Sequence, residues 1–292
     1  MIVDEIMKQT VDEHKARFHH DLQQATFLHV QNIADYFEEK EEWALSDLPT
    51  MMPPWPVFWM EWRSPEKQKM ENPLFDGAGW AVFGHRGEQP VEVFPADLSE
   101  PTTAFELSLA AYYVFPRRNV GYRFLNGVGN YWIAASDGRV FSVPDKNGRM
   151  VGTIELPEEE ARSDDQVDFM RGFVRYCARV AGLALSFCHA KNVPLCRNEI
   201  SPRLWQKQRR NGKLGVSSFY TLDIPAITSR LSVGADAGQS MAQRLHLCRG
   251  HFKDYREHGL FGRQRGIYWW DMQARGKAAM GEVRKDYRVS TQ

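Results

Sequence analysis

Four side chains between residues 249 and 255 have the chemistry to bind and cleave a phosphodiester, provided that this part of the chain is a strand. Alternate residues of a strand share one face, and four active side chains would then stand in one row: Arg249, His251, Lys253 and Tyr255. An imidazole titrates near neutral pH and can move a proton, while a guanidinium and an ammonium can hold a phosphate. The same row would equally suit the solvent-facing side of an edge strand.

Cleavage of an RNA phosphodiester without a metal ion requires a small set of groups. A base deprotonates the 2′-hydroxyl, an acid protonates the leaving oxygen, and cations stabilise the charged phosphorane. We therefore predict as candidate catalytic residues His251, Lys253, Arg249 and Tyr255. Only one histidine lies in the row, so the sequence leaves open whether the chain is an enzyme.

A metal centre is a weaker interpretation of the same region. Soft ligands occur at Cys188-His189, at Cys196 and at Cys248-x-x-His251. Cys248 would lie on the opposite face of the strand from His251, and the other ligands would come from a helix and a loop. We therefore predict neither a metal site nor a cofactor. The four cysteines are too few for a disulfide scaffold and fit a reducing compartment.

Basic residues alternate with aromatic ones in two stretches near the C-terminal end, around Trp205 and from residue 263 to residue 275. Cations suit a phosphate backbone and aromatic rings suit stacked bases. The candidate nucleic-acid-binding residues are Arg203, Lys207, Arg209, Arg210, Lys213, Arg263, Arg265, Trp269, Trp270 and Arg275. For the first stretch, a solvated basic loop before a strand is the alternative interpretation.

The zero net charge of the chain hides an asymmetry. From residue 197 to residue 292 there are 18 Lys and Arg residues against 8 Asp and Glu residues, a net charge of +10, so the remainder carries −10. A basic C-terminal third either faces a polyanion or is attracted to the acidic part of the same protein.

The composition indicates a globular protein outside the membrane. The chain has 292 residues, 43% of them hydrophobic, and no run approaches the ~18 apolar residues of a membrane helix. The acidic, amphipathic N-terminus lacks the basic, apolar and small-residue order of a signal peptide. We expect no membrane association and a cytoplasmic location.

Hydrophobic periodicity predicts an α+β fold with N-terminal helices, a central mostly antiparallel sheet and one long packed helix. Apolar residues recur at helical spacing over residues 3–43, with a break near residues 23–28. The clearest helix covers about residues 163–191, and its wide apolar stripe predicts that it packs on the sheet. We expect a helical element over residues 1–47 and an α+β domain over residues 48–292, with its basic third at residues 197–292.

Short strands fill the middle of the chain, beginning with an apolar run at Val57–Met60. Turn residues such as Ser136-Asp137-Gly138 separate the later strands as in an antiparallel meander. The Asn126–Asn130 segment lacks phosphate-loop spacing and is predicted to be a turn between two strands. Glu61, among apolar neighbours, would either act as an acid or base or point outward.

The stretch RGHFKDY…LFG…GIYWW…RG, between Arg249 and Gly276, resembles the C-terminal end of uncharacterised proteins of bacteriophages, prophages and other mobile elements. The resemblance implies a phage or mobile-element setting, and it implies no mechanism. The predicted function is nucleic-acid interaction through the C-terminal third, with RNA or DNA as the partner, in a metal-independent ribonuclease or toxin-like effector. The alternative is a non-enzymatic protein that inhibits or recruits a bacterial host or defence protein through its acidic N-terminal helices.

Overall fold

The structure is a computed structural model. It describes residues 2–4, 20–39, 44–63, 79–95, 98–117, 121–141, 143–144, 150–151, 154–155, 164–224, 244–248, 250–270, 273–275 and 277–282. The chain divides into two compact units: residues 1–189 with 194–223, and residues 190–193 with 224–292. The predicted boundary at residue 47 lies inside unit 1. The basic C-terminal third is divided between the two units.

Unit 1 is built on a large mixed sheet. Eight of its strands follow one another across the sheet in the order β10 (Ile154–Glu155), β6 (Gly121–Ala134), β5 (Thr102–Arg117), β3 (Gly79–Arg86), β2 (Val57–Arg63), β1 (Thr26–His29), β12 (Ser218–Leu222) and β11 (Leu195–Glu199). β4 (Val91–Val93) pairs with β5, and β7 (Val140–Phe141) pairs with β6. Only β1 is parallel to its described neighbours, β2 and β12. The predicted α+β class and the mostly antiparallel sheet are confirmed.

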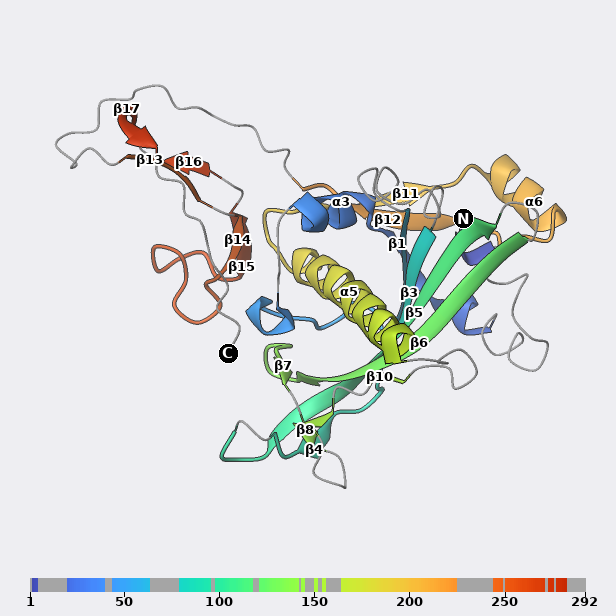
Figure 1. Ribbon diagram of the computed structural model, residues 1–292, viewed down its shortest axis with the longest axis horizontal. Coiled ribbons are helices and arrows are strands. Elements are labelled where there is room, and N and C mark those ends of the chain that lie inside the picture. The colour runs from blue at the N-terminus through green and yellow to red at the C-terminus, as the bar shows by residue number, and fades with distance from the viewer. Residues whose placement is uncertain are drawn as a thin grey trace. The chain divides into compact units, whose positions relative to one another are not determined.

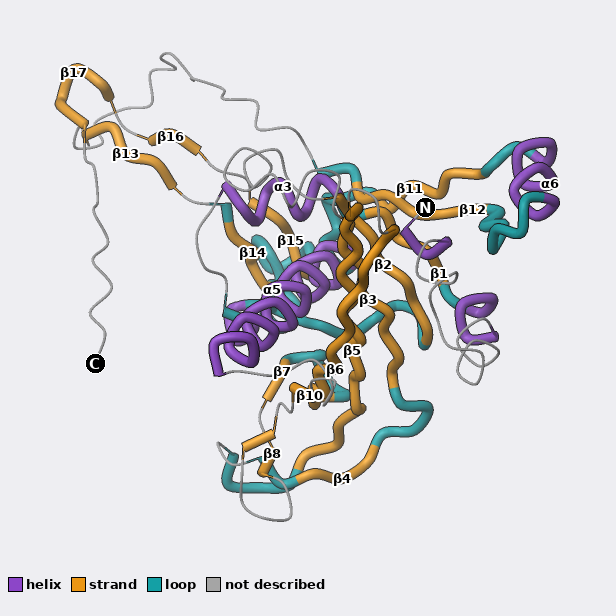
Figure 2. The backbone as a smooth tube through the Cα atoms, turned by 45° about the vertical axis from the view of Figure 1, so that its right-hand side comes forward, coloured by secondary structure: helices purple, strands orange, loops and turns teal. Residues whose placement is uncertain are grey.

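The long helix α5 (Asp164–Cys188) covers one face of this sheet, with α3 (Gln31–Glu39) beside it (Figures 1 and 2). From Val174 onward its inner side is closely packed, and Val180 to Phe187 are all buried. Its aromatic residues meet tryptophans of the sheet: the Phe173 and Trp80 rings lie 5.6 Å apart. This layer agrees with the wide apolar stripe of the sequence.

The opposite face of the sheet holds the second part of the core, around Trp59. Residues 2–4 and Leu22 pack there with Phe27 and Val216. Glu61 does not point into solvent: it is 8% exposed and accepts hydrogen bonds from the Trp59 Nε1 (3.1 Å) and the Val3 amide (3.3 Å). Glu61 therefore fastens the beginning of the chain to the sheet, because a buried carboxylate needs such donors.

The structure adds a strand that the sequence analysis did not predict, and it contradicts one predicted turn. The break in the N-terminal helices contains a strand, β1, which lies inside the sheet between β2 and β12. The Asn126–Asn130 segment is not a turn, because β6 continues through it and pairs with β5 along its length. At Gly129 the Tyr131 ring fills the space that a side chain of residue 129 would occupy, since a Cβ there would lie 2.9 Å from the ring. Glycine therefore fits this position of the strand.

Three further small sheets occur among the described residues. β8 (Val143–Pro144) pairs with β9 (Met150–Val151). In unit 2, β13 (Arg244–Cys248) lies between β16 (Gln273–Arg275) and β17 (Lys277–Glu282), and β14 (His251–Asp254) forms an antiparallel hairpin with β15 (Ile267–Trp270). Asn192 ties this hairpin to residues 190–193 by hydrogen bonds to both backbone groups of Trp269.

None of the helices in the described part of the chain has the length and apolar character required to cross a membrane.

Candidate nucleic-acid interface

The basic stretch around Trp205 forms a short helix, α6 (Pro202–Arg210), between β11 and β12. The Ser201 side chain accepts a hydrogen bond from the Leu204 amide, and Pro202 follows in the first helical position. Basic residues in the last turn complement the helix dipole. The sequence analysis assigned no helix to these residues and gave a solvated basic loop as the alternative to phosphate binding. The Ser-Pro start is the signal that could have indicated the helix.

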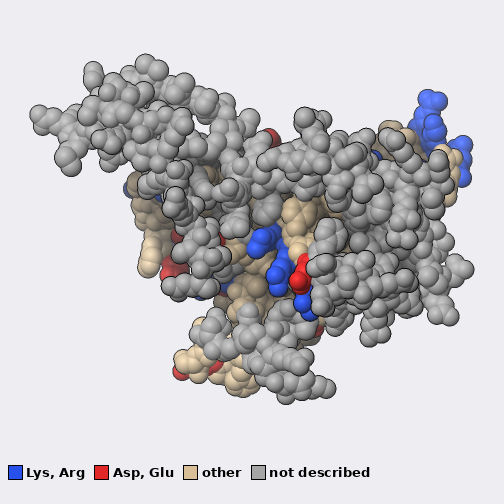
Figure 3. Space-filling model, viewed as in Figure 1, with Lys and Arg blue, Asp and Glu red and all other residues tan. Residues whose placement is uncertain are grey.

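Helix α6 exposes its cations and buries none of its nine residues. Five basic side chains of this region are exposed: Arg203, Lys207, Arg209, Arg210 and Lys213. Figure 3 shows this basic group at the position of α6 in Figure 1. No acidic residue occurs between residues 201 and 213, and none of the five forms an ion pair with a residue that the structure describes. Their charge is therefore available to an anionic partner.

Trp205 is fixed at the base of this helix. Its Nε1 donates a hydrogen bond of 2.6 Å to the Gly215 carbonyl oxygen, and the Arg209 guanidinium carbon lies 5.2 Å from the centre of its ring. Gly215 has a φ of +71°, and a Cβ there would lie 2.5 Å from the Arg209 side chain. The sequence thus requires glycine at this position, both for its backbone conformation and for the close approach of Arg209.

A pocket of about 650 Å³ opens beside Trp205, within unit 1. Its walls combine cations, aromatic rings and small polar groups, and they come from the segment before β1, from β1, β11, α6 and β12, and from the chain between α6 and β12. The lining residues are Leu22, Gln23, Ala25, Thr26, Phe27, Arg197, Trp205, Arg209, Leu214, Gly215, Val216, Ser217, Ser218 and Tyr220. Four of them are suited to a nucleotide: two arginines, a tryptophan and a tyrosine.

The arrangement can bind one flat, anionic group. Arg197 and Arg209 supply guanidinium forks that suit phosphate oxygens. Trp205 and Tyr220 supply ring surface on which a base can lie. Arg209 lies over one face of Trp205, and the Trp55 ring lies 5.3 Å from that of Tyr220. Arg197 lies 3.7 Å from the Glu199 carboxylate, and both side chains are more than half exposed, so this ion pair is weak and a phosphate can compete for Arg197.

A row of arginines on α5 was not predicted. Arg171, Arg175 and Arg179 recur every four residues and therefore lie on one side of the helix; Figure 3 shows basic side chains over α5. Arg171 pairs with Asp168 at 3.7 Å. The basic residues of α6, in contrast, accompany Trp205 and the pocket that it lines. We therefore favour α6 over α5 as the interface.

The predicted catalytic row is only partly described. His251 and Lys253 lie on one face of β14, and Tyr255 follows directly after it. His251 is exposed, whereas the Lys253 ammonium lies 4.1 Å from the centre of the Trp270 ring and the Tyr255 ring lies 6.0 Å from that of Tyr268. Arg249 lies outside the described residues. The face thus carries an imidazole and an ammonium, and the role of its residues in catalysis stays a prediction.

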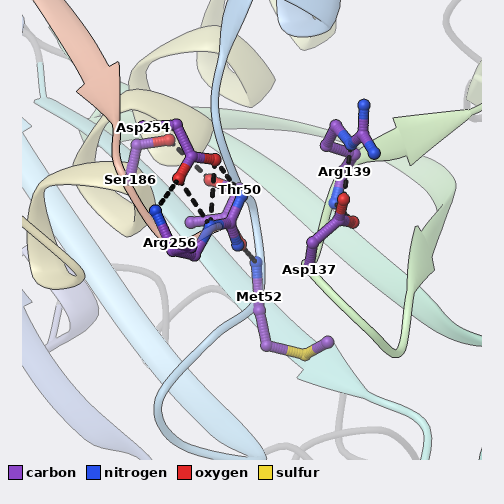
Figure 4. Close-up of polar contacts among 7 residues, drawn as sticks. All are labelled: Thr50, Met52, Asp137, Arg139, Ser186, Asp254 and Arg256. Atoms are coloured by element: carbon purple, nitrogen blue, oxygen red, sulfur yellow. Dashed lines mark hydrogen bonds and ion pairs between the residues drawn. The ribbon is translucent and has the colours of Figure 1, made fainter. Parts of the chain in front are cut away.

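Asp254 lies on the other face of β14 and is already paired. Its carboxylate accepts hydrogen bonds from the Arg256 side chain at 2.5–3.0 Å, and from the Arg256 amide at 3.0 Å (Figure 4). This local pair stabilises the turn after the strand, as Asp residues commonly do. Neither group of the pair is therefore a candidate for proton transfer.

The predicted binding residues of unit 2 differ in accessibility. Trp269 is 3% exposed and packs against Phe252, with ring centres 4.8 Å apart, so it is a packing residue and not a stacking surface. The Trp270 ring is half-buried, and Lys253 lies over it. Arg263 and Arg265 are exposed in the β14–β15 loop. Arg275 is in β16, and its side chain lies outside the described residues.

Among the described residues, no group of three or more His, Cys, Asp or Glu side chains could hold a metal ion. Cys177 is fully buried in α5, and burial raises the pKa of its thiol well above the ordinary value. Burial also raises the pKa of Cys188 to about 12. Thiolates are the metal-binding form of cysteine, so these two residues pack in the helix interface as the sequence indicated.

Comparison of the chain with protein-family models, with curated proteins and with solved structures finds no match. The function must therefore be argued from the site itself.

Proposed function

We propose that this protein binds single-stranded nucleic acid, with RNA as the first candidate, through α6 and the pocket at its base. The observation that carries the proposal is that Trp205, on a helix of exposed cations, lines an open pocket together with Arg197 and Arg209. A nucleobase would enter the pocket and stack, while the neighbouring phosphates would meet the guanidinium groups and the basic residues of α6.

The concave shape of the pocket favours a single strand. The bases of a duplex are stacked and paired, so they cannot enter a pocket unless they are first extruded, whereas the bases of a single strand are free to turn outward. The sequence also contains no helix-turn-helix pattern that would place α6 in a major groove.

A phage or mobile-element setting is part of the proposal. It is supported by the resemblance of the Arg249–Gly276 stretch alone. Cleavage of the bound RNA is a separate step of the proposal, supported by the position of His251 beside Lys253 on one face of β14. It is tested by following the integrity of RNA incubated with wild type and with His251→Ala, and equal rates of cleavage, or none with either protein, would reject catalysis by His251.

The binding proposal is tested by fluorescence anisotropy with a labelled single strand of about 16 nucleotides, long enough for one extended binding site, and with the corresponding duplex. We expect the single strand to bind more tightly than the duplex. We expect Trp205→Leu to weaken binding about 5-fold or more, since loss of a stacking ring costs about 1–3 kcal/mol. Trp205→Phe keeps a ring and is expected to have an intermediate effect.

Equal affinities of wild type and Trp205→Leu for the single strand would reject the pocket as the binding site. Preferential binding of the duplex would reject the single-strand proposal. Circular dichroism of each variant checks that the fold is retained.

A protein partner is the second candidate function, and one surface favours it. Val91, Phe94 and Leu98 are 46%, 65% and 51% exposed, on β4 and the chain that follows it. Exposed apolar side chains on and directly after a strand at the edge of a sheet are typical of interaction surfaces. Of the acidic N-terminal helices that the sequence suggested for this role, residues 5–19 and 40–43 lie outside the described residues. Copurification of a bacterial protein with wild type, but not with Phe94→Asp, would support this candidate.

A further inference from the structure

The loop of the β14–β15 hairpin ends in a tight turn at Phe261. Leu260 and Gln264 pair across the turn, with the Leu260 amide donating to the Gln264 carbonyl oxygen at 2.7 Å and the Gln264 amide donating to the Leu260 carbonyl oxygen at 3.2 Å. The Arg263 amide also donates to the Leu260 carbonyl oxygen, at 3.1 Å. The chain therefore presents one defined tip, held by backbone hydrogen bonds.

Phe261 is an unfavourable residue for this tip. Its φ is +53°, and among the described residues no other non-glycine has a positive φ. Gly262 follows with a φ of +70°, so both central residues have the left-handed conformation of a type I′ turn, where Asn, Asp and Gly are preferred. A phenylalanine in this conformation is strained because its Cβ crowds the backbone.

Packing does not compensate for the strain. The Phe261 side chain is 90% exposed, the highest value among the exposed large hydrophobic residues of the described chain. A ring that contacts water on nearly all sides contributes little to folding. Strained residues that folding does not explain occur preferentially at functional sites. The residue is thus better explained by a contact with a ligand.

The surroundings of the ring indicate the kind of ligand. Arg263 and Arg265 are exposed on the same loop, and the exposed Glu257 and His258 at its start lie 3.7 Å from each other. Leu260, the nearest apolar neighbour, is only partly exposed. A protein interface or a membrane anchor normally combines several apolar side chains. One isolated ring with two guanidinium groups suits an unpaired base and its phosphates.

We propose that Phe261 is a stacking tip that lies against an unpaired base of the bound nucleic acid, with Arg263 and Arg265 on the adjacent phosphates. This inference rests on the proposed function, and it adds a second base contact, in unit 2. It also explains why a large aromatic residue stands where asparagine or glycine would fold more easily.

The test uses the full-length protein and a single-stranded RNA that contains 2-aminopurine, a base whose fluorescence is quenched when it stacks. The informative variant is Phe261→Asn, because asparagine suits the turn and removes the ring. We expect this variant to keep the fold, to bind the RNA about 5-fold or more weakly than wild type, and to quench the probe less. Phe261→Trp restores a ring and is expected to retain both quenching and affinity.

The matched control is Phe94→Asn, which removes another exposed phenylalanine, 65% exposed and distant in the sequence. We expect it to bind the RNA as wild type does.

The outcomes separate the inference from the proposed function. If wild type does not bind the RNA, both fail. If wild type binds and Trp205→Leu weakens binding while Phe261→Asn binds and quenches as wild type does, the stacking tip is rejected and the pocket stands. Vesicles that contain anionic lipid serve as a further probe. Binding of wild type to them that is lost in Phe261→Asn, with RNA affinity unchanged, would overturn the inference in favour of a membrane contact.

Discussion

Helices α5 and α6 belong to the same unit and have opposite relations to its core. α5 has 25 residues, and its second half is buried almost without interruption. α6 has nine residues and buries none. The residues of α5 are therefore explained by packing on the sheet, including its two cysteines. The exposed basic side chains of α6 are not explained in this way, and we propose that they contact a partner.

Two aromatic residues of unit 2 also differ in whether packing explains them. Trp269 is 3% exposed and packs on Phe252, so folding accounts for it. Phe261 is 90% exposed in a strained conformation, so folding does not. Exposure and strain, more than residue type, distinguish candidate contacts from core residues in this protein.

The largest expected effect is a difference in thiol reactivity between the cysteines of the packed helix α5 and the exposed cysteine of β11, the strand that precedes α6. Burial raises the pKa of Cys188, at the end of α5, from 9.0 to about 12, so about one thiol in 10,000 would be ionised at pH 8. Cys196 on β11 is exposed. We expect iodoacetamide to modify Cys196 in the folded protein and Cys177 and Cys188 only after unfolding, as measured by mass mapping of the labelled peptides. Modification of Cys188 at the rate of Cys196 would contradict the packing of α5.

The raised pKa of Cys188 also has a consequence for stability. Burial favours the neutral Cys188 thiol in the folded protein. The stability that this thiol contributes is complete below pH 9, the ordinary pKa. It is lost as the pH rises toward 12, because the thiol of the unfolded chain ionises at lower pH. A Cys188→Ala variant should show a smaller decrease in the free energy of unfolding between pH 8 and pH 11 than wild type does.

The next largest expected effect is on the free energy of unfolding when a leucine is replaced by alanine on each of the two helices. Leu183 on α5 is fully buried, and Leu204 on α6 is 47% exposed. We expect Leu183→Ala to lower the free energy of unfolding by about 2–5 kcal/mol because it leaves a cavity. Leu204→Ala should change it by less than about 0.5 kcal/mol. Urea unfolding measures both, and equal costs would show that α6 is packed in solution.

A smaller effect is expected where α6 meets the pocket. Gly215→Ala places a Cβ 2.5 Å from the Arg209 side chain and strains a backbone with a φ of +71°. We expect a loss of about 1–2 kcal/mol in the free energy of unfolding together with weaker RNA binding. Gly212→Ala is the control, since Gly212 has a similar φ of +70° but nothing lies within 4 Å of its Cβ position. If both variants bind RNA equally, the geometry around Arg209 does not matter for binding.

The smallest expected effect is a gain. Phe261→Asn relieves the strain of a positive φ, and we expect the turn to become more stable by up to about 1 kcal/mol. Amide hydrogen exchange of Arg263 and Gln264, whose amides both donate to the Leu260 carbonyl oxygen, measures this locally. Faster exchange in the variant would mean that the ring supports the turn and would weaken the functional explanation.

Much of the fold follows from patterns of short range. The wide apolar stripe predicted that α5 is packed, and the Val57–Met60 run predicted β2. β1 was missed because its four residues, Thr26–His29, lie between helical segments and continue their apolar periodicity. β6 was divided in two because its glycines resemble a turn, whereas the Tyr131 ring fills the space beside Gly129.

The basic residues around Trp205 could be singled out from the sequence, whereas Arg197, Tyr220 and the pocket that they line could not. The spacing of the cations around Trp205 indicated phosphate binding. The pocket brings together residues 22–27, Arg197 and residues 205–220, and no local pattern relates segments so far apart. The exposure and the positive φ of Phe261 could not be predicted either, because a phenylalanine between a leucine and a glycine indicates neither of them.

The most direct test of the account is the salt dependence of RNA binding by two double variants. Lys207→Gln/Arg210→Gln removes two exposed cations from α6, and Arg171→Gln/Arg175→Gln removes two from α5. Each phosphate contact with a single strand contributes about 0.7 to the slope of log affinity against log salt. We predict that the α6 variant loses about 1.4 of this slope and that the α5 variant keeps the wild-type slope. Equal slopes for wild type and the α6 variant, or a loss only on α5, would contradict the assignment of the interface to α6.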